Sequence, residues 1–154
     1  MPVFYIDGQS LGNQQRGQPR VARIVVLYKE KPSAAFTIEH EDIGDMTNNE
    51  AEYHALLKAL SIIEAKTAAD GQPVAPKRRG GIPIEIFSDS QLIVKQVKGE
   101  YQVTDRRLQD LRDKATKIME RIGSVSVKWV PREENHAGRW LEKHLDSPSP
   151  PKQA

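Results

Sequence analysis

Three acidic residues of this 154-residue chain stand in apolar surroundings, where an ionised carboxylate is costly unless it has a partner. Asp7 follows the apolar stretch at residues 3–6, and Asp89 follows an alternating apolar stretch at residues 82–87. Glu52 lies on the apolar side of a predicted helix. If these three side chains converge in the fold, their oxygen atoms could hold a metal ion.

A helix is predicted to begin at Thr47, because Thr47 and Glu50 have the spacing of a capping box. Glu50 therefore has a structural role at the start of the helix. Glu52 has none, since it heads the apolar face, whose other members are Leu56, Ala59, Leu60 and Ile63. A helix end that turns Glu52 toward solvent is the simpler alternative to a functional role.

The strands that would position the acids are short and close together in the sequence. Residues 3–6, 21–28 and 34–40 are predicted to form an antiparallel meander, with Asp7 at the tip of the first strand. The helix and a fourth strand at residues 82–87 then form a β-α-β crossover, which favours parallel pairing and would bring Asp89 next to Asp7. Alternatively, Asp89 or Ser90 only caps a helix at residues 92–97.

The remaining chain predicts two helices, one strand and two loop segments. The first helix has the apolar stripe Leu108, Leu111, Ala115, Ile118 and Ile122, a strand follows at residues 125–129, and a short helix opens at Asn135. Residues 67–81 form a loop whose basic residues Lys77, Arg78 and Arg79 are more typical of a solvated tip than of a nucleic-acid contact. We expect one domain at residues 1–146 and a disordered Pro-rich tail at residues 147–154.

Composition excludes several classes of protein. The chain has no cysteine, which rules out a disulfide scaffold, a thiol nucleophile and a thiolate zinc site. Its 23 basic and 21 acidic residues give a net charge of +2, so the distribution of charge is more informative than the sum. The sequence has no apolar run of membrane-spanning length and no signal-peptide pattern at residues 1–8. We expect a soluble cytoplasmic protein that acts as a monomer, with no membrane or protein partner.

Four stretches resemble the type 1 ribonuclease H family. They read YIDGQSLGN at residues 5–13, TNNEAEYHAL at 47–56, FSDSQLIVKQVKGEY at 87–101 and VKWVPREEN at 127–135. The likeness covers the chain from Val3 to Leu145. It implies an α/β fold with a five-stranded mixed sheet, in which an antiparallel three-strand meander and two parallel strands are flanked by helices.

The resemblance also implies an activity and the residues that perform it. The family's metal-binding catalytic acids fall on Asp7, Glu52 and Asp89, which would hold two Mg²⁺ or Mn²⁺ ions about 3.5–4 Å apart. Such an enzyme hydrolyses the RNA strand of RNA/DNA hybrids to products with a 5′ phosphate. The substrate-contacting positions would be Gly8, Asn13, Thr47, Asn48, Asn49 and Gln91, although turn and cap chemistry alone can explain Asn48 and Asn49.

One position departs from the family pattern. A fourth acid usually stands four residues after the Asn that opens the last helix, but here Asn135 leads to Arg139, and a cation there would repel a metal ion. Glu142 lies one helical turn further on and could substitute for the acid. The departure motivates one alternative, a module that binds hybrid or double-stranded nucleic acid without efficient cleavage. A weaker alternative is a related-fold nuclease that resolves or joins DNA, because the same carboxylate core recurs in such enzymes.

Overall fold

The structure is a computed structural model that describes residues 2–10, 21–69 and 83–144. Several sequence-based expectations fall outside these ranges: the substrate position Asn13, the basic loop residues 77–79, Leu145 and the tail at residues 147–154. Within the described ranges, none of the helices has the combination of length and hydrophobicity that a membrane span requires.

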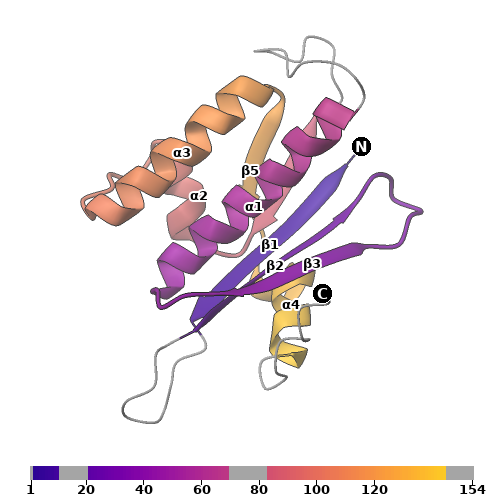
Figure 1. Cartoon of the computed structure of the whole chain (residues 1–154), viewed down its shortest axis with the longest axis horizontal. Coiled ribbons are helices and arrows are strands. Elements are labelled where there is room, and N and C mark those ends of the chain that lie inside the picture. The colour runs from indigo at the N-terminus through magenta and orange to yellow at the C-terminus, as the bar shows by residue number, and fades with distance from the viewer. Residues whose placement is uncertain (1, 11–20, 70–82, 145–154) are drawn as a thin grey trace.

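A five-stranded mixed sheet forms the centre of the fold (Figure 1). Its strands lie in the order β3-β2-β1-β4-β5, with β1 antiparallel to β2, β2 antiparallel to β3, and β4 parallel to both β1 and β5. Their bounds are β1 Val3–Ser10, β2 Ala22–Lys29, β3 Thr37–Ile43, β4 Ile84–Ser88 and β5 Val125–Trp129. The fold class expected from the sequence is confirmed.

Two of the predicted strands differ from the structure by three or four residues at an end. The first strand continues past Asp7 to Ser10, because Asp7 and Gly8 pair with Val25 and Ile24 of the antiparallel neighbour. Asp7 therefore lies within β1 and not at its tip. The third strand runs over Thr37–Ile43, not over residues 34–40, because Ala34 belongs to the preceding turn, where its amide donates to the Lys31 carbonyl at 3.0 Å.

Helices cover both faces of the sheet. One face carries α1 (Asn48–Ala69), α2 (Gln91–Val97) and α3 (Arg106–Ile122), whereas α4 (His136–Lys143) lies on the other face (Figure 1). Alternate residues of β2 show the division, since Ile24 and Val26 pack into the core beneath α1 while Val25 and Leu27 pack against Ala137 and Leu141 of α4. The expected stripe of α3 lies in or against the core.

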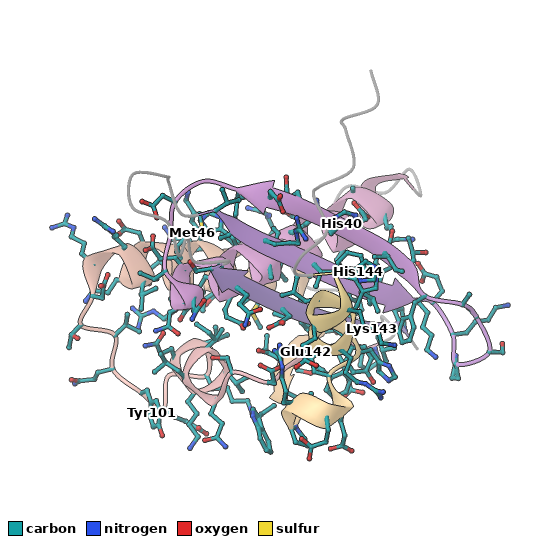
Figure 2. The ribbon with its side chains drawn as sticks, turned by 90° about the horizontal axis from the view of Figure 1, so that it is seen from below. His40, Met46, Tyr101, Glu142, Lys143 and His144 are labelled. Carbon is teal, nitrogen blue, oxygen red and sulfur yellow. The ribbon has the colours of Figure 1, made fainter. Side chains whose placement is uncertain are left out.

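The end of α4 is held to the sheet by a buried arginine. Arg23 on β2 forms an ion pair with Asp42 at 2.6 Å and also donates to the backbone carbonyl of His144. Beside it, the Trp140 ring stacks on His144 and lies 4.8 Å from His40, and Figure 2 shows His144, which follows the last residue of α4, near His40 of β3. These contacts fix the orientation of α4, and therefore of the side chains on its solvent-facing side.

The start of α1 has the capping box that the sequence predicts. The Glu50 amide donates to Thr47 Oγ1 at 3.2 Å, and the Thr47 amide donates to Glu50 Oε1 at 3.3 Å. This first turn approaches β1 very closely at Gly8. A Cβ atom at Gly8 would overlap the Ala51 carbonyl and lie 2.8 Å from the Glu52 nitrogen. Gly8 is thus required for α1 to lie against β1 with Glu52 beside the strand.

Replacing Gly8 with alanine should destabilise the protein, because the obstructing atoms belong to the backbone of α1 and cannot rotate away. We expect Gly8→Ala to lower the free energy of unfolding by about 1–3 kcal/mol, measured by urea denaturation. Gly44→Ala is the matched control, since a Cβ atom there has no neighbour within 4 Å and its stability should change by only about 0.5 kcal/mol. Equal stability of the two variants would contradict this role for Gly8.

Candidate metal centre

The register of the parallel strands places Asp7 beside Asp89. Val3 pairs with Glu85 and Tyr5 with Phe87, a constant offset in residue number that, continued two residues further, sets Asp7 opposite Asp89. Asp89 follows the last residue of β4, while Asp7 remains inside β1. Asp7 and Asp89 are therefore close together, as expected, because β1 and β4 pair in parallel and not because both acids lie at strand tips.

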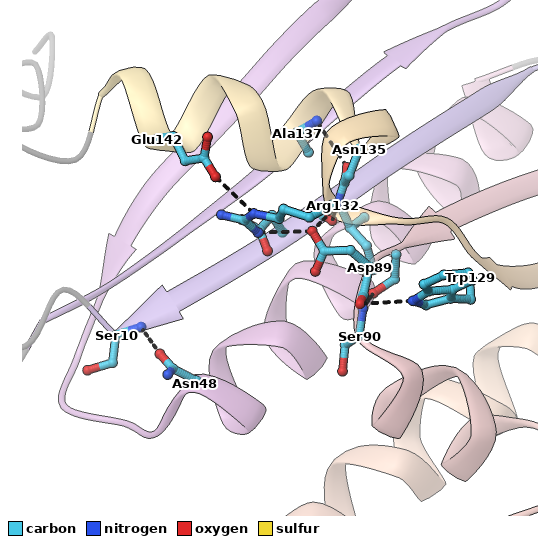
Figure 3. A network of polar contacts seen from close by, with 12 residues as sticks. Ser10, Asn48, Asp89, Ser90, Trp129, Arg132, Asn135, Ala137 and Glu142 are labelled. Atoms are coloured by element: carbon cyan, nitrogen blue, oxygen red, sulfur yellow. Dashed lines mark hydrogen bonds and ion pairs between the residues drawn. The ribbon is translucent and has the colours of Figure 1, made fainter.

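Asp89 is not the cap of the helix that follows it. Ser90 is the N-cap of α2, and its hydroxyl accepts from the Ile93 amide at 3.2 Å. This resolves the alternative left open by the sequence and leaves the Asp89 carboxylate available for other contacts. The Asp89 carbonyl accepts from the indole Nε1 of Trp129 at 3.1 Å, which attaches the end of β4 to β5 (Figure 3).

Glu52 completes a cluster with the two aspartates. One carboxylate oxygen from each of Asp7, Glu52 and Asp89 lies within 4.8 Å of the others. Glu52 is only 8% exposed, so the alternative in which it turns toward solvent is wrong. Its Oε2 atom is buried without a hydrogen-bond partner in the described structure. A buried, unpaired carboxylate oxygen needs a cation or a proton.

Burial and mutual repulsion change the protonation of this cluster. Burial raises the pKa of Glu52 well above its ordinary value, and the negative charge of Asp7 raises it further. Burial also raises the pKa of Asp7; the charge of Asp89 adds to this rise, and hydrogen bonds from Glu52 and Arg132 oppose it. The metal-free site therefore favours a proton on Glu52.

A cation of the protein itself lies among these acids. Nη1 of Arg132 is 2.9 Å from Oδ2 of Asp7 and 2.9 Å from Oδ2 of Asp89. Burial alone would lower the pKa of Arg132, but the charges of both aspartates raise it above its usual value. The Asn135 side chain lies next to this contact, donating to Asp89 Oδ2 at 2.9 Å and to the Ile6 carbonyl at 3.0 Å (Figure 3).

The sequence pattern does not predict roles for Arg132 and Asn135 at this site. Arg132 lies between the predicted last strand and the helix that opens at Asn135, and Asn135 does cap that helix, α4. A topological signal was present: β5 runs parallel to β4, so the segment after β5 must emerge at the same edge of the sheet as Asp89. Charge complementarity between that segment and the acids could then have been recognised.

The two uncertain fourth positions lie apart from the acids. Arg139 is exposed on α4, and within the described ranges no hydrogen bond or ion pair joins it to the three acids. Glu142 contacts Arg132, with Oε1 at 3.1 Å from Nε, and its side chain is 54% exposed (Figure 3). Glu142 is thus connected to the acidic cluster through the guanidinium.

The predicted substrate positions have mixed placements. Gly8 lies beneath α1, and Thr47 caps that helix. Asn48 is exposed and accepts from the Ser10 amide at 2.7 Å, which ties the end of β1 to the start of α1. Asn49 is half-buried in the first turn of α1. Gln91 is exposed and lines a shallow groove between α2 and β5 together with Lys95, Lys98 and Trp129.

The donor set fits a hard divalent cation. Asp7, Glu52 and Asp89 offer only carboxylate oxygens, which are the ligands that Mg²⁺ and Mn²⁺ prefer. The buried Glu52 Oε2 without a partner is the atom that such an ion would satisfy. The same three residues can bind one proton and the Arg132 guanidinium when no ion is bound.

Comparison with known proteins matches this chain to a family model and to a curated ribonuclease. A family model described as reverse transcriptase-like matches residues 77–144. Ribonuclease HI of Halobacterium salinarum is 34% identical over 131 residues, which are 85% of this chain and 57% of that protein. The chain therefore spans little more than half the length of this curated relative.

Two solved structures match almost end to end. The crystal structure of RNase H1 from Halobacterium salinarum NRC-1 has a TM-score of 0.68 at 30% identity, covering 96% of this chain and 98% of that chain. LC11-RNase H1, crystallised in complex with an RNA/DNA hybrid, has a TM-score of 0.71 at 30% identity and covers 92% of this chain and 93% of that chain.

The raised pKa of Glu52 predicts a pH-dependent cost in stability. The folded state binds this proton more tightly than the unfolded chain, so stability falls as the pH rises from 4.5, the ordinary value, toward the folded pKa. In chelator at neutral pH we expect Glu52→Gln to raise the free energy of unfolding by about 1–3 kcal/mol. This gain should shrink as the pH is lowered to about 4, in urea denaturation measured across the pH range.

Glu50→Gln is the control for this effect. Its carboxylate caps the helix and makes an ion pair with the exposed Arg107 at 3.7 Å, so the substitution should lower stability by roughly 1 kcal/mol or less at neutral pH. A Glu52→Gln protein that is less stable than wild type in chelator at neutral pH would show that the buried carboxylate is not a cost to the fold.

Proposed function

Since the chain belongs to the type 1 ribonuclease H family, we propose that it is a metal-dependent endonuclease that hydrolyses the RNA strand of RNA/DNA hybrids. The observation that carries the proposal is the convergence of Asp7, Glu52 and Asp89 within 4.8 Å, with one buried oxygen lacking a partner. The hybrid bound to LC11-RNase H1 supports the same class of substrate.

The proposed site would hold two Mg²⁺ or Mn²⁺ ions on the three carboxylates. Such ions would supply an activated water and stabilise the departing 3′ oxygen, leaving a 5′ phosphate on the product. The protein's own residues perform the positioning. Asn135 orients Asp89 by a hydrogen bond, and the packing of α1 on Gly8 holds Glu52 beside Asp7.

The surroundings of the site suit a phosphate backbone. Lys95 and Lys98 line the groove beside Asp89, where Gln91 and the half-exposed Trp129 ring also lie. Cations attract the backbone of either strand, whereas polar side chains such as Asn48 and Gln91 can contact 2′-hydroxyl groups. We assign Gly8, Asn13, Thr47, Asn48, Asn49 and Gln91 to substrate binding as part of this proposal.

A second candidate function is a binding module that cleaves poorly. It is favoured by the absence of an acid at position 139 and by the presence of Arg132 between Asp7 and Asp89. A site with three acids and one internal cation has less negative charge with which to attract metal ions. The two functions differ in turnover and not in the nucleic acid that they bind.

Cleavage of a hybrid labelled on the RNA strand tests the proposal. With Mg²⁺ or Mn²⁺ we expect RNA fragments that carry 5′ phosphates, and no cleavage in chelator. Asp89→Asn should reduce the rate to below about one hundredth of wild type, because a ligand is lost. Glu50→Gln, which changes the helix cap and an ion pair with the exposed Arg107 but none of the three acids, should retain near wild-type activity. Tight binding of the hybrid without cleavage by either ion would identify the binding module instead.

A further inference from the structure

Arg132 brings a fixed positive charge into the carboxylate cluster. A single nitrogen, Nη1, contacts Asp7 and Asp89 at 2.9 Å each, which is the bridging role that a divalent ion would otherwise take between them. Within the described ranges, every ion pair of these two aspartates is made with Arg132. A divalent ion that bridged these same two Oδ2 atoms would have to take the place of Nη1 between them.

The guanidinium has space because residue 138 is a glycine. A Cβ atom at Gly138 would lie 2.9 Å from Arg132 Nη1 and 3.1 Å from Asp89 Oδ2. Any larger residue would therefore press on the contact between Arg132 and Asp89. The next residue, Arg139, is exposed, so α4 contributes room for a cation at this point and no acid.

Glu142 holds the other end of the same side chain. Its Oε1 atom is 3.1 Å from Nε of Arg132, whereas the aspartates contact Nη1. The guanidinium is planar, so these two contacts use different edges of the group. The bond to Glu142 can therefore persist when Nη1 leaves the aspartates, and Glu142, which is half-exposed, provides a second position for the charge.

We propose that Arg132 is a resident counter-cation of the acidic cluster that divalent ions must displace, and that Glu142 retains Arg132 once it is displaced. The inference rests on the proposed function only in assigning divalent ions to Asp7, Glu52 and Asp89. It explains how the fold tolerates the buried Asp7 and Glu52 beside the half-buried Asp89 without metal, and it predicts weaker metal binding than the same three acids would show alone.

Calorimetric titration of Mn²⁺ in the absence of nucleic acid tests the competition. Removing a charge that contacts two ligands should lower the dissociation constant of Arg132→Gln about tenfold relative to wild type. Arg139→Gln is the matched control, because it removes the same charge from the exposed side of α4, and its dissociation constant should change by roughly twofold at most. Equal affinity of Arg132→Gln and wild type would overturn the inference while leaving the proposed nuclease activity untouched.

If neither wild type nor Arg132→Gln binds Mn²⁺, the inference falls together with the metal-dependent part of the proposed function. The melting temperature gives a second readout. In chelator, Arg132→Gln should melt several degrees below wild type, because the aspartates lose their counter-ion, and saturating Mn²⁺ should recover most of this loss.

A double-mutant cycle tests the role of Glu142. Glu142→Gln should weaken Mn²⁺ binding in the wild-type background, because the displaced arginine then has no second position. In the Arg132→Gln background the same substitution should have little effect. An equal loss of affinity in both backgrounds would overturn the proposed role, since Glu142 would then act on the metal ion directly.

A measurement on the wild-type protein removes any dependence on variants that fold poorly. In protein labelled with ¹⁵N-arginine, titration with diamagnetic Mg²⁺ should shift the side-chain signal of Arg132 with the midpoint of metal binding. The signal of Arg139 should stay in place. An Arg132 signal that does not move at saturating Mg²⁺ would show that the guanidinium and the ion do not compete.

Discussion

The convergence of three carboxylates, two of them buried, is the constraint on which the rest of the structure depends. Asp7 is 1% exposed and Glu52 8%, so neither charge is stabilised by solvent. In the described structure the Arg132 guanidinium offsets this cost for Asp7. Burial raises the pKa of Glu52, which favours the protonated and uncharged form of that side chain. Divalent ions bound to the three acids would replace both the guanidinium and the proton.

Ordinary elements of the fold bring the acids together. The parallel register of β1 and β4 sets the two aspartates side by side, and the missing side chain at Gly8 lets the first turn of α1 lie on β1. Ser90 takes over the capping of α2, which releases Asp89 from that duty. Each feature satisfies a requirement of the backbone, and together they bring the three carboxylates close to one another.

The second face of the sheet contributes through α4. This helix packs on Val25 and Leu27, and the buried Arg23 holds its C-terminal end. From that position Glu142 reaches Arg132, while Asn135 at the other end of the helix orients Asp89. Family members usually carry a fourth acid in this helix, whereas here the helix supplies a space at Gly138 and a carboxylate that contacts an arginine. Side chains from both faces of the sheet therefore contribute to the site.

Periodicity and cap chemistry in the sequence alone determined the order of strands and helices, the capping box at Thr47 and the distinction between Glu50 and Glu52. These features depend on residues within a few positions of one another, which is why sequence spacing reveals them. Tertiary structure alone decided the length of β1, the start of β3, and the contact of Arg132 with Asp7, 125 residues away. Strand register and the path of the segment after β5 are set by long-range pairing, which local spacing does not encode.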